Sequence, residues 1–455
     1  MKNKVLLFII GCVSLVWVSC MDSNEVDYAA SRDCRISTFS LSHDSMPTLG
    51  TVRFTIDQLT GRIFNIDSMP FGTVLRDKVV CSLNYGPGTQ SMQVVAEASN
   101  DTIWWGGKDS IDFRKPVHFT TYAYDNVTKL TYEAQLNIHQ VNPDTMNWYK
   151  ETVAELGFPI AEETVLSYTS ANGNTQYLRY VKELGGAYRL FVSPMGGAFS
   201  WTEQSLSGLP VQGLFLKQLT RVGTDLYILG EDGTLFKSKD TQTFEVLPTT
   251  DKVCTLLGGI DMGQRQEECL VVLAEKDNIL RHAVIGKTGT WRYGDAVKED
   301  FPVKGAASTS FESMNYNRLF LAGGYGQSDN VLKSAWVSLD GLVWAETIKK
   351  DSVPFGYRGD AALAQYDEKL FLLGGFDEKG APTSDIYVSP DEGVTWAVDT
   401  MLVLPAEFMG RGKSSIVVDD EDFLHVFGGT TKLGEGEALN DIWTGRINRL
   451  GFVEQ

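Results

Sequence analysis

The stretch DEKLFLLGGFDEKGAPTSDIYVSPDEGVTWAVD, residues 367–399, contains three short apolar runs separated by polar turns. The first run ends in Gly374-Gly375, the second carries Tyr387, and the third begins near Trp396. Short runs rich in aliphatic and aromatic residues and bounded by glycine and aspartate are typical of antiparallel strands. The preceding segment RGDAALAQY, residues 358–366, adds one more. We therefore expect a unit of four strands.

This unit is repeated along the chain. Two further copies are YNRLFLAGGYGQSDNVLKSAWVSLDGLVWAET from Tyr316 and DEDFLHVFGGTTKLGEGEALNDIWTGRINRLGF from Asp420, preceded by KGAASTSF and RGKSSIVV. Four strands in a repeated unit predict the blades of a β-propeller. An aromatic at the expected fourth strand marks each unit: Trp201, Phe244, Trp291, Trp344, Trp396 and Phe452. Six such positions predict six blades, and Trp148 either closes the ring in place of the last strand, leads in, or marks a seventh blade.

Two features of the repeats resemble known motifs. The Gly-Gly pairs followed by an aromatic resemble kelch repeats, and S-x-D-x-G-x-T-W at Ser389 to Trp396 resembles the Asp-box of sialidases and other propellers. We expect Asp391 to accept hydrogen bonds from amides of a turn, Gly393 to take a positive φ, and Trp396 to fill the space between blades. The motif is therefore predicted to be part of the frame.

Residues 35–143 have a different pattern. Runs such as VVCSL, MQVVAEA, VHFTTYAYD and YEAQLNIHQV alternate apolar and polar residues and are separated by turn sequences. This predicts a β-sandwich, and the segment HFTTYAYDNVTKLTYEAQLNI resembles the closing hairpin of immunoglobulin-like modules. Trp104 and Trp105 are adjacent, so on a strand one of them points away from the core. An outward tryptophan either stacks on a sugar ring or contacts protein.

The first twenty residues are a separate segment. MKNK is basic, VLLFIIGCVSLVWV is apolar, and Cys20 follows a small residue. This resembles a bacterial lipoprotein signal, with Trp17 where the motif usually has leucine. It implies a lipid on Cys20 and attachment to the outer membrane, on its periplasmic or cell-surface side. The expected organisation is a signal peptide (1–20), a linker (21–34), the sandwich (35–143) and the propeller (144–455).

Charge and cysteine content limit the functions. A net charge of −18 leaves no basic surface for nucleic acid. Five scattered histidines lack the spacing of a zinc site, so we expect neither metal nor cofactor. After the lipid-bearing cysteine, Cys34, Cys81, Cys254 and Cys269 remain; Cys254 and Cys269 either pair across a hairpin or all four are reduced thiols.

The starts of the blades provide the candidate site. Arg358, within Tyr357-Arg358-Gly359, and Arg411, within Gly410-Arg411-Gly412, lie at similar distances before their Gly-Gly pairs, and Lys304 lies slightly further away. In kelch rings such residues line the central channel. We therefore expect Tyr357, Arg358, Arg411 and Lys304 to bind an anionic group of a ligand. The alternative is that the arginines donate to backbone carbonyls of the adjoining blade.

The order of signal, sandwich and propeller resembles an uncharacterised family of Bacteroidetes lipoproteins, a domain-of-unknown-function family. The resemblance implies an architecture and a location but no reaction. The R-I-P signature of sialidases and the copper ligands of kelch oxidases are missing, whereas a sugar epimerase has modest residue requirements. We expect a non-catalytic module that binds a glycan or a protein; the alternative is an enzyme acting on a glycan or sugar acid at the central channel.

Overall fold

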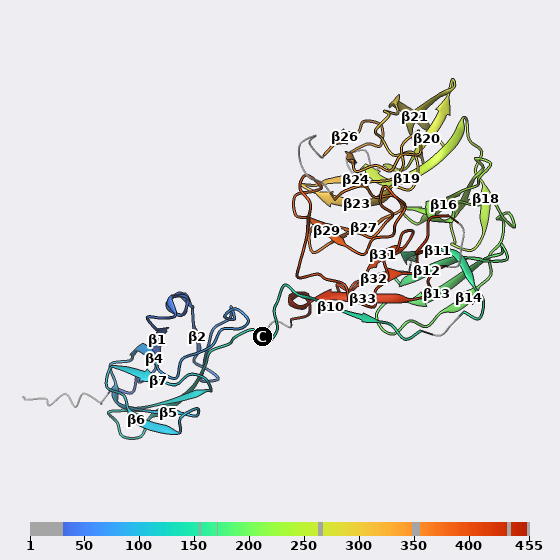
Figure 1. The fold of residues 1–455 in the computed structure, drawn as a ribbon. Coiled ribbons are helices and arrows are strands. Elements are labelled where there is room, and N and C mark those ends of the chain that lie inside the picture. The colour runs from blue at the N-terminus through green and yellow to red at the C-terminus, as the bar shows by residue number, and fades with distance from the viewer. Residues whose placement is uncertain are drawn as a thin grey trace, which may run out of the picture. The chain divides into compact units, whose positions relative to one another are not determined.

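The computed structural model describes residues 31–153, 156–170, 172–262, 267–347, 355–434 and 438–452 (Figure 1). They form two compact units that divide between Asn142 and Pro143, and each is all-β apart from short 3-10 turns. The predicted signal and Cys20 lie outside the described residues. None of the helices in the described part of the chain is long and apolar enough to cross a membrane.

The N-terminal unit contains two sheets. Neighbouring strands are antiparallel, except that β3 runs parallel to β9. One sheet has the order β1 (Ile36–Ser42), β4 (Val79–Tyr85), β7 (Lys108–Ile111). The other has the order β2 (Thr55–Asp57), β3 (Arg62–Phe64), β9 (Lys129–Gln135), β8 (Val117–Ala123), β5 (Thr89–Ala96), β6 (Asp101–Trp104), and the turn η1 (Pro47–Thr51) follows β1.

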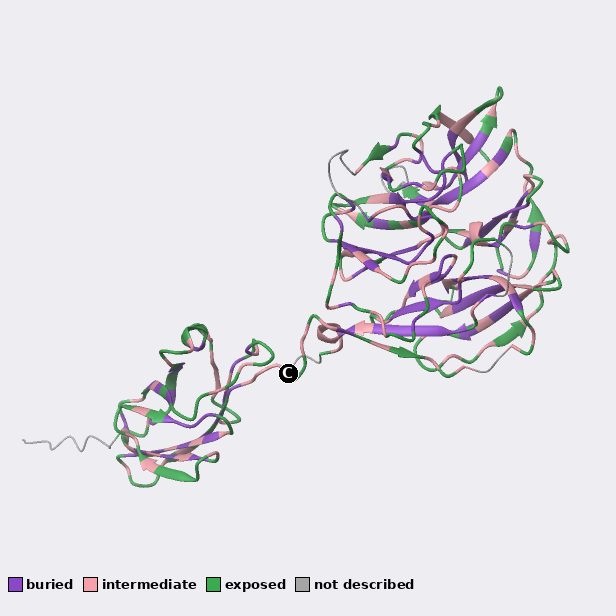
Figure 2. Cartoon of the chain, in the orientation of Figure 1, coloured by how far each residue is buried: buried purple, intermediate pink, exposed green. Residues whose placement is uncertain are grey.

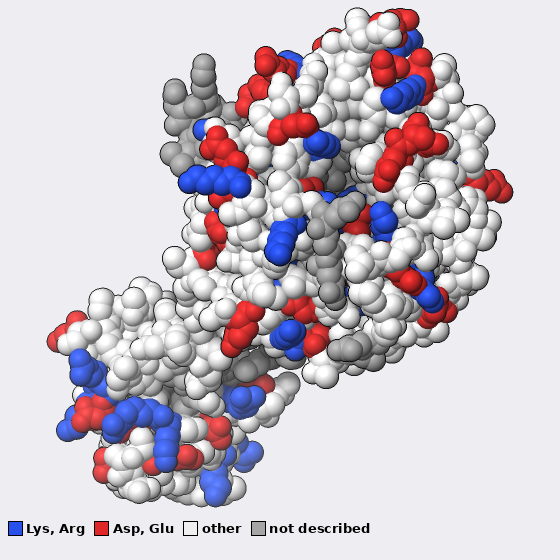
Figure 3. Space-filling model, turned by 45° about the vertical axis from the view of Figure 1, so that its right-hand side comes forward, with Lys and Arg blue, Asp and Glu red and all other residues white. Residues whose placement is uncertain are grey.

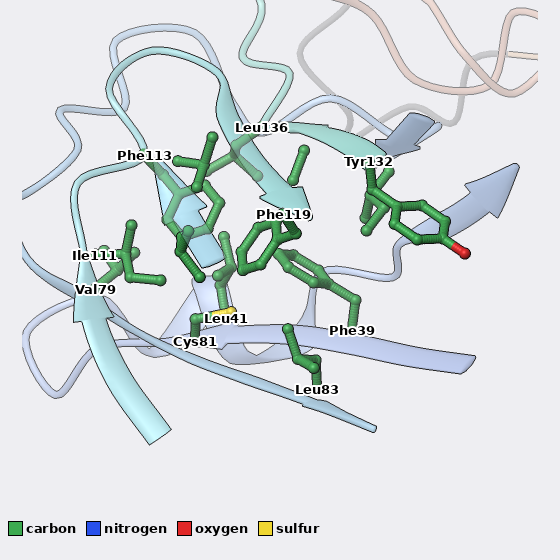
Figure 4. Packing of buried hydrophobic residues seen from close by; sticks show 14 of the residues in the cluster. Phe39, Leu41, Val79, Cys81, Leu83, Ile111, Phe113, Phe119, Tyr132 and Leu136 are labelled. Atoms are coloured by element: carbon green, nitrogen blue, oxygen red, sulfur yellow. The ribbon is translucent and has the colours of Figure 1, made fainter. Parts of the chain in front are cut away.

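The two sheets enclose one hydrophobic core. Inward residues of both sheets alternate with outward ones, and Figure 4 shows Leu41 and Cys81 of the smaller sheet near Phe119 of the larger. Phe39 meets Phe119 edge to face at 5.8 Å between ring centroids, an arrangement that aromatic pairs favour. The predicted sandwich and its β8–β9 hairpin are therefore present.

The second unit contains six four-stranded antiparallel sheets among the described residues. In chain order, the first five are β11 (Ile160–Thr169), β12 (Thr175–Glu183), β13 (Tyr188–Pro194), β14 (Thr202–Gln204); β15 (Thr220–Val222), β16 (Asp225–Leu229), β17 (Leu235–Ser238), β18 (Phe244–Val246); β19 (Lys252–Met262), β20 (Glu267–Lys276), β21 (Ile279–Gly286), β22 (Trp291–Ala296); β23 (Ala307–Ser313), β24 (Tyr316–Ala322), β25 (Ala335–Ser338), β26 (Ala345–Glu346); and β27 (Ala362–Tyr366), β28 (Lys369–Leu373), β29 (Ile386–Ser389), β30 (Ala397–Val398). The turn η2 (Leu216–Gln218) leads into β15.

The sixth sheet joins the two ends of this unit. It consists of β31 (Ser415–Val418), β32 (Leu424–Phe427), β33 (Ile442–Ile447) and β10 (Met146–Lys150). β10 pairs with β33, so Trp148 occupies the fourth strand for which Phe452 was predicted, and Phe452 follows the turn η3 (Asn448–Gly451) instead. The first strands β27 and β31 contact each other, as do β31 and β11. This pairing covers the edge of β33 with a distant part of the chain.

The Gly-Gly pairs allow neighbouring sheets to approach closely. Gly374 has a φ of +63°, and a Cβ there would lie 2.4 Å from the carbonyl oxygen of Arg411 in the next sheet. Gly375 donates its N–H to the same oxygen at 2.8 Å. Only glycine fits this conformation and this contact.

The hairpin from Ser389 to Trp396 has the predicted framing role. Asp391 Oδ1 accepts from the Thr395 amide at 2.8 Å, and Gly393 has a φ of +90°. Trp396 is buried and packs against Phe320 and Phe355. The motif is therefore a structural turn.

Buried residues concentrate along the strands, whereas the turns are exposed (Figure 2). The described cysteines Cys34, Cys81, Cys254 and Cys269 are all free. The alternative of a Cys254–Cys269 disulfide is wrong, because Cys269 faces Ile260 across the hairpin while Cys254 lies near its other end.

Candidate functional site

Arg411 was predicted to line a ligand site, and the structure contradicts this. Its guanidinium is fully buried and donates to the Asp441 carboxylate at 2.5 and 3.1 Å, to the Gly428 carbonyl at 2.9 Å and to the Met409 carbonyl at 3.0 Å. These bonds use four of its five N–H donors. Arg411 therefore fastens β33 to the start of its own sheet, the structural alternative considered above.

Arg358 makes the corresponding contact in the preceding sheet. It donates to Asp385 at 2.8 Å and to the Tyr357 carbonyl, and it lies over the ring of Tyr387. Only 8% of its side chain is exposed. Tyr357 is partly buried, with the Lys333 ammonium 5.2 Å from its ring centroid. Both arginine side chains are therefore buried in ion pairs within their own sheets.

The backbone register shows which residues are equivalent in the segments that precede the first strands of three successive sheets. Lys304, Gly359 and Gly412 form equivalent isolated bridges, to Tyr325, Phe376 and Thr430 respectively. Lys304 therefore corresponds to the glycines that follow the arginines, one position later than predicted. The next residue in each segment is Gly305, Asp360 or Lys413, and all three have a positive φ.

These three residues link successive sheets. Asp360 N donates to the Gly305 carbonyl at 2.8 Å, and Lys413 N donates to the Asp360 carbonyl at 2.7 Å. A left-handed conformation is uncommon for residues other than glycine, and such residues often occur at functional sites. The segments before β23, β27 and β31 thus converge, and they bring the Asp360 and Lys413 side chains to the place where the first strands meet.

We call Lys217, Lys304, Tyr325, Asp360 and Lys413 the lysine–aspartate cluster. Tyr325 Oη donates to Asp360 Oδ2 at 3.2 Å. Burial raises the pKa of Asp360 above its ordinary value, although the charges of Lys413, Lys217 and Lys304 and the Tyr325 hydrogen bond act in the opposite direction. The charges of three lysines thus act on one carboxylate.

Lys217, in η2, is the most perturbed lysine of the cluster. Burial lowers its pKa to about 8, with the nearby Lys413 charge adding to this effect and Glu162, Glu163 and Asp360 opposing it. Its Nζ donates to Ser415 Oγ at 3.2 Å. Lys217 therefore changes charge just above neutral pH. Lys304, by contrast, has half of its side chain exposed and pairs with Asp329 at 2.6 Å.

Sequence reasoning identified Lys304 but missed the rest of the cluster. Asp385 and Asp441 precede the third strands of their sheets and provide the partners of Arg358 and Arg411. This Asp-aromatic pattern was a signal that both arginines belong to the frame. Lys217 had no comparable signal, because its sheet lacks the Gly-Gly pair that aligns the others.

The other charged groups of the second unit include a buried ion pair, Arg179 with Glu163 at 2.6 Å. On the face of the second unit shown in Figure 3, acidic and basic side chains are interspersed. Among the described residues, no three His, Cys, Asp or Glu side chains are grouped so as to hold a metal ion.

Fold and site together define an all-β protein with a sandwich unit and a propeller unit. The DUF6242 beta propeller domain matches residues 142–455, and the N-terminal domain of the same domain-of-unknown-function family, DUF6242, matches residues 29–136. The chain belongs to this family.

Other comparisons add little. One solved structure, titled "Structure of YjhT", is 13% identical, with a TM-score of 0.46, over 64% of this chain and 96% of that chain. At these values the likeness has no bearing on function. A search of curated proteins finds no match.

Proposed function

We propose that the protein is a lipid-anchored binding module of the outer membrane, periplasmic or cell-surface, whose propeller holds a ligand without transforming it. The six sheets are six blades of a kelch-like ring closed by β10, the N-terminal unit is an immunoglobulin-like spacer, and Cys20 carries the lipid. The ligand is a carboxylate- or sulfate-bearing glycan, or an acidic segment of a protein, and it binds at the lysine–aspartate cluster.

The arrangement of Lys217, Lys304 and Lys413 around Asp360 carries this proposal. Lysine ammonium groups are compact charges with three donors each, suited to carboxylate and sulfate oxygens. Asp360 acts on all three, Asp329 also pairs with Lys304, and Glu162 and Glu163 act on Lys217, so Lys413 is the lysine least offset by other acids. Because the whole chain has a charge of −18, an acidic ligand is attracted only close to these lysines.

An enzyme acting on a glycan or sugar acid is the second candidate. It is favoured by one observation, the opposite displacement of two neighbouring pKa values: that of Asp360 is raised and that of Lys217 is lowered. Groups with shifted pKa values occur preferentially at functional sites.

The test is a binding screen of acidic oligosaccharides, sulfated glycans and acidic peptides with the full chain. The double variant combines Lys217→Ala with Lys413→Ala. Lys239→Ala is the control, because Lys239 is an exposed lysine of the same unit. We expect the double variant to lose binding while the control retains it. Binding that survives in the folded double variant, or no acidic ligand at all, overturns the proposal. Mass spectrometry of each bound ligand after incubation tests for turnover.

A further inference from the structure

The outward face of the larger sheet in the N-terminal unit carries an unusual tryptophan. Trp104, in the edge strand β6, is 63% exposed, whereas its neighbour Trp105 packs against the hydrophobic core. Strand alternation places these two side chains on opposite faces. Trp105 therefore packs on the core side of the sheet, and the Trp104 side chain lies on the other side, away from the core.

The strand register extends Trp104 into a row of polar side chains. Trp104 is opposite Gln93 in β5, Gln93 is opposite Thr120 in β8, and Thr120 is opposite Thr131 in β9. All four lie on the outward face, and the two threonine hydroxyls are 3.3 Å apart. At about 4.8 Å between neighbouring strands, the row extends about 14 Å.

A second aromatic side chain lies next to the row. The ring of Tyr122 is 6.1 Å from that of Trp104 between centroids, at an interplanar angle of 46°. In β8, Tyr122 and His118 lie on either side of Thr120, and His118 Nε2 is 2.8 Å from Glu97 Oε1. The face thus combines two tilted rings with an amide, two hydroxyls and an imidazole, and the charged Glu97, Lys129 and Glu133 flank the row.

This composition favours one kind of partner. The core of a protein interface is enriched in apolar side chains, whereas three of the four residues in this row are polar and none is charged. An indole offers a flat apolar surface to the C–H groups of a pyranose ring, and amide and hydroxyl groups both donate to and accept from sugar hydroxyls. A neutral carbohydrate matches both features.

We propose that this face binds a neutral oligosaccharide, with one sugar ring on Trp104 and its neighbours along Gln93, Thr120 and Thr131. The length of the row fits several linked sugars rather than one. The site is independent of the lysine–aspartate cluster, since it lies in the other unit and requires no charge.

The test is calorimetric titration of the full chain with cellohexaose, xylohexaose, mannohexaose and maltohexaose, together with an array of neutral glycans. The variants are Trp104→Ala, Trp104→Phe and Gln93→Ala. Leu59→Ala is the control, because Leu59 is a 98% exposed apolar residue of the same unit outside this face. We expect Trp104→Ala to weaken binding at least tenfold, Trp104→Phe to restore part of it, and Leu59→Ala to have no effect.

Three results overturn the proposal. They are no binding of any neutral glycan by the parent, binding unchanged by Trp104→Ala, or neutral glycan binding that requires Lys217 and Lys413. Thermal unfolding of each variant confirms that a loss of binding is not a loss of fold. Loss of acidic-ligand binding in the lysine variants alone leaves this inference standing, so the two proposals fail separately.

Discussion

Arg411 and Lys413 are two residues apart, yet we expect different effects from replacing them with alanine: the first change lowers stability, and the second weakens ligand binding. Arg411→Ala removes a fully buried guanidinium and leaves the Asp441 carboxylate, 9% exposed, without its main cationic partner. It also leaves the Gly428 and Met409 carbonyls without this donor. Lys413 is partly exposed and contributes charge rather than packing.

The size of the effect follows from the contacts. Breaking a buried ion pair by removing one partner costs about 3–5 kcal/mol, since it strands the other charge. With an unfolding entropy of about 2.1 cal/mol/K per residue over roughly 300 residues, this lowers the melting temperature of the propeller unit by about 5–8 °C. Lys413→Ala should cost about 1 kcal/mol or less, because its charge acts on Asp360 but is partly exposed, and it should weaken binding of the acidic ligand.

Differential scanning calorimetry of the full chain measures both variants against the parent. The sandwich unit serves as an internal reference, because neither residue belongs to it. A melting temperature for Arg411→Ala within about 1 °C of the parent would refute the framing role. An equal loss of stability in Lys413→Ala would show that the distinction between frame and site is wrong.

Three further predictions concern single residues. Because Lys217 loses its charge above a pKa of about 8, affinity for an acidic ligand should fall about tenfold between pH 7 and pH 9; calorimetry would measure this, and an equal fall in Lys217→Arg would contradict it. Gly374→Ala should destabilise the propeller by several kcal/mol in thermal unfolding, because it combines a left-handed φ with a 2.4 Å approach to the Arg411 carbonyl oxygen. Gly289→Ala is its control, with a φ of +82° but no atom within 4 Å of the added Cβ, and an equal cost in both would attribute the effect to φ alone. Iodoacetamide at neutral pH should label the partly exposed Cys254 before the buried Cys81, because burial raises the pKa of both thiols but fully encloses only Cys81; peptide mass spectrometry showing Cys81 first would contradict this.

Patterns confined to a few neighbouring residues were sufficient for much of the fold. Short apolar runs and Gly-Gly pairs predicted the strands of the propeller, and the roles of Asp391, Gly393 and Trp396 were predicted correctly. In each case the residue contacts either its own hairpin or the neighbouring repeat of the same four-stranded unit. Alternation alone also showed that one of Trp104 and Trp105 points outward.

The candidate site depended on register and distant pairing. Arg411 and Lys413 are both cations near the start of one strand, and only the position of Asp441, thirty residues later, decides which of them is buried. Lys304 was aligned one residue away from its true equivalents because the loops of successive repeats differ in length. The closure by β10 and the approach of Lys217 to Asp360 join segments far apart in the chain. The amino-acid pattern by itself determined the strands and their turns, since these depend on local periodicity. Only the tertiary structure decided which charges meet at the centre, because a shift of one residue reverses the direction of a side chain.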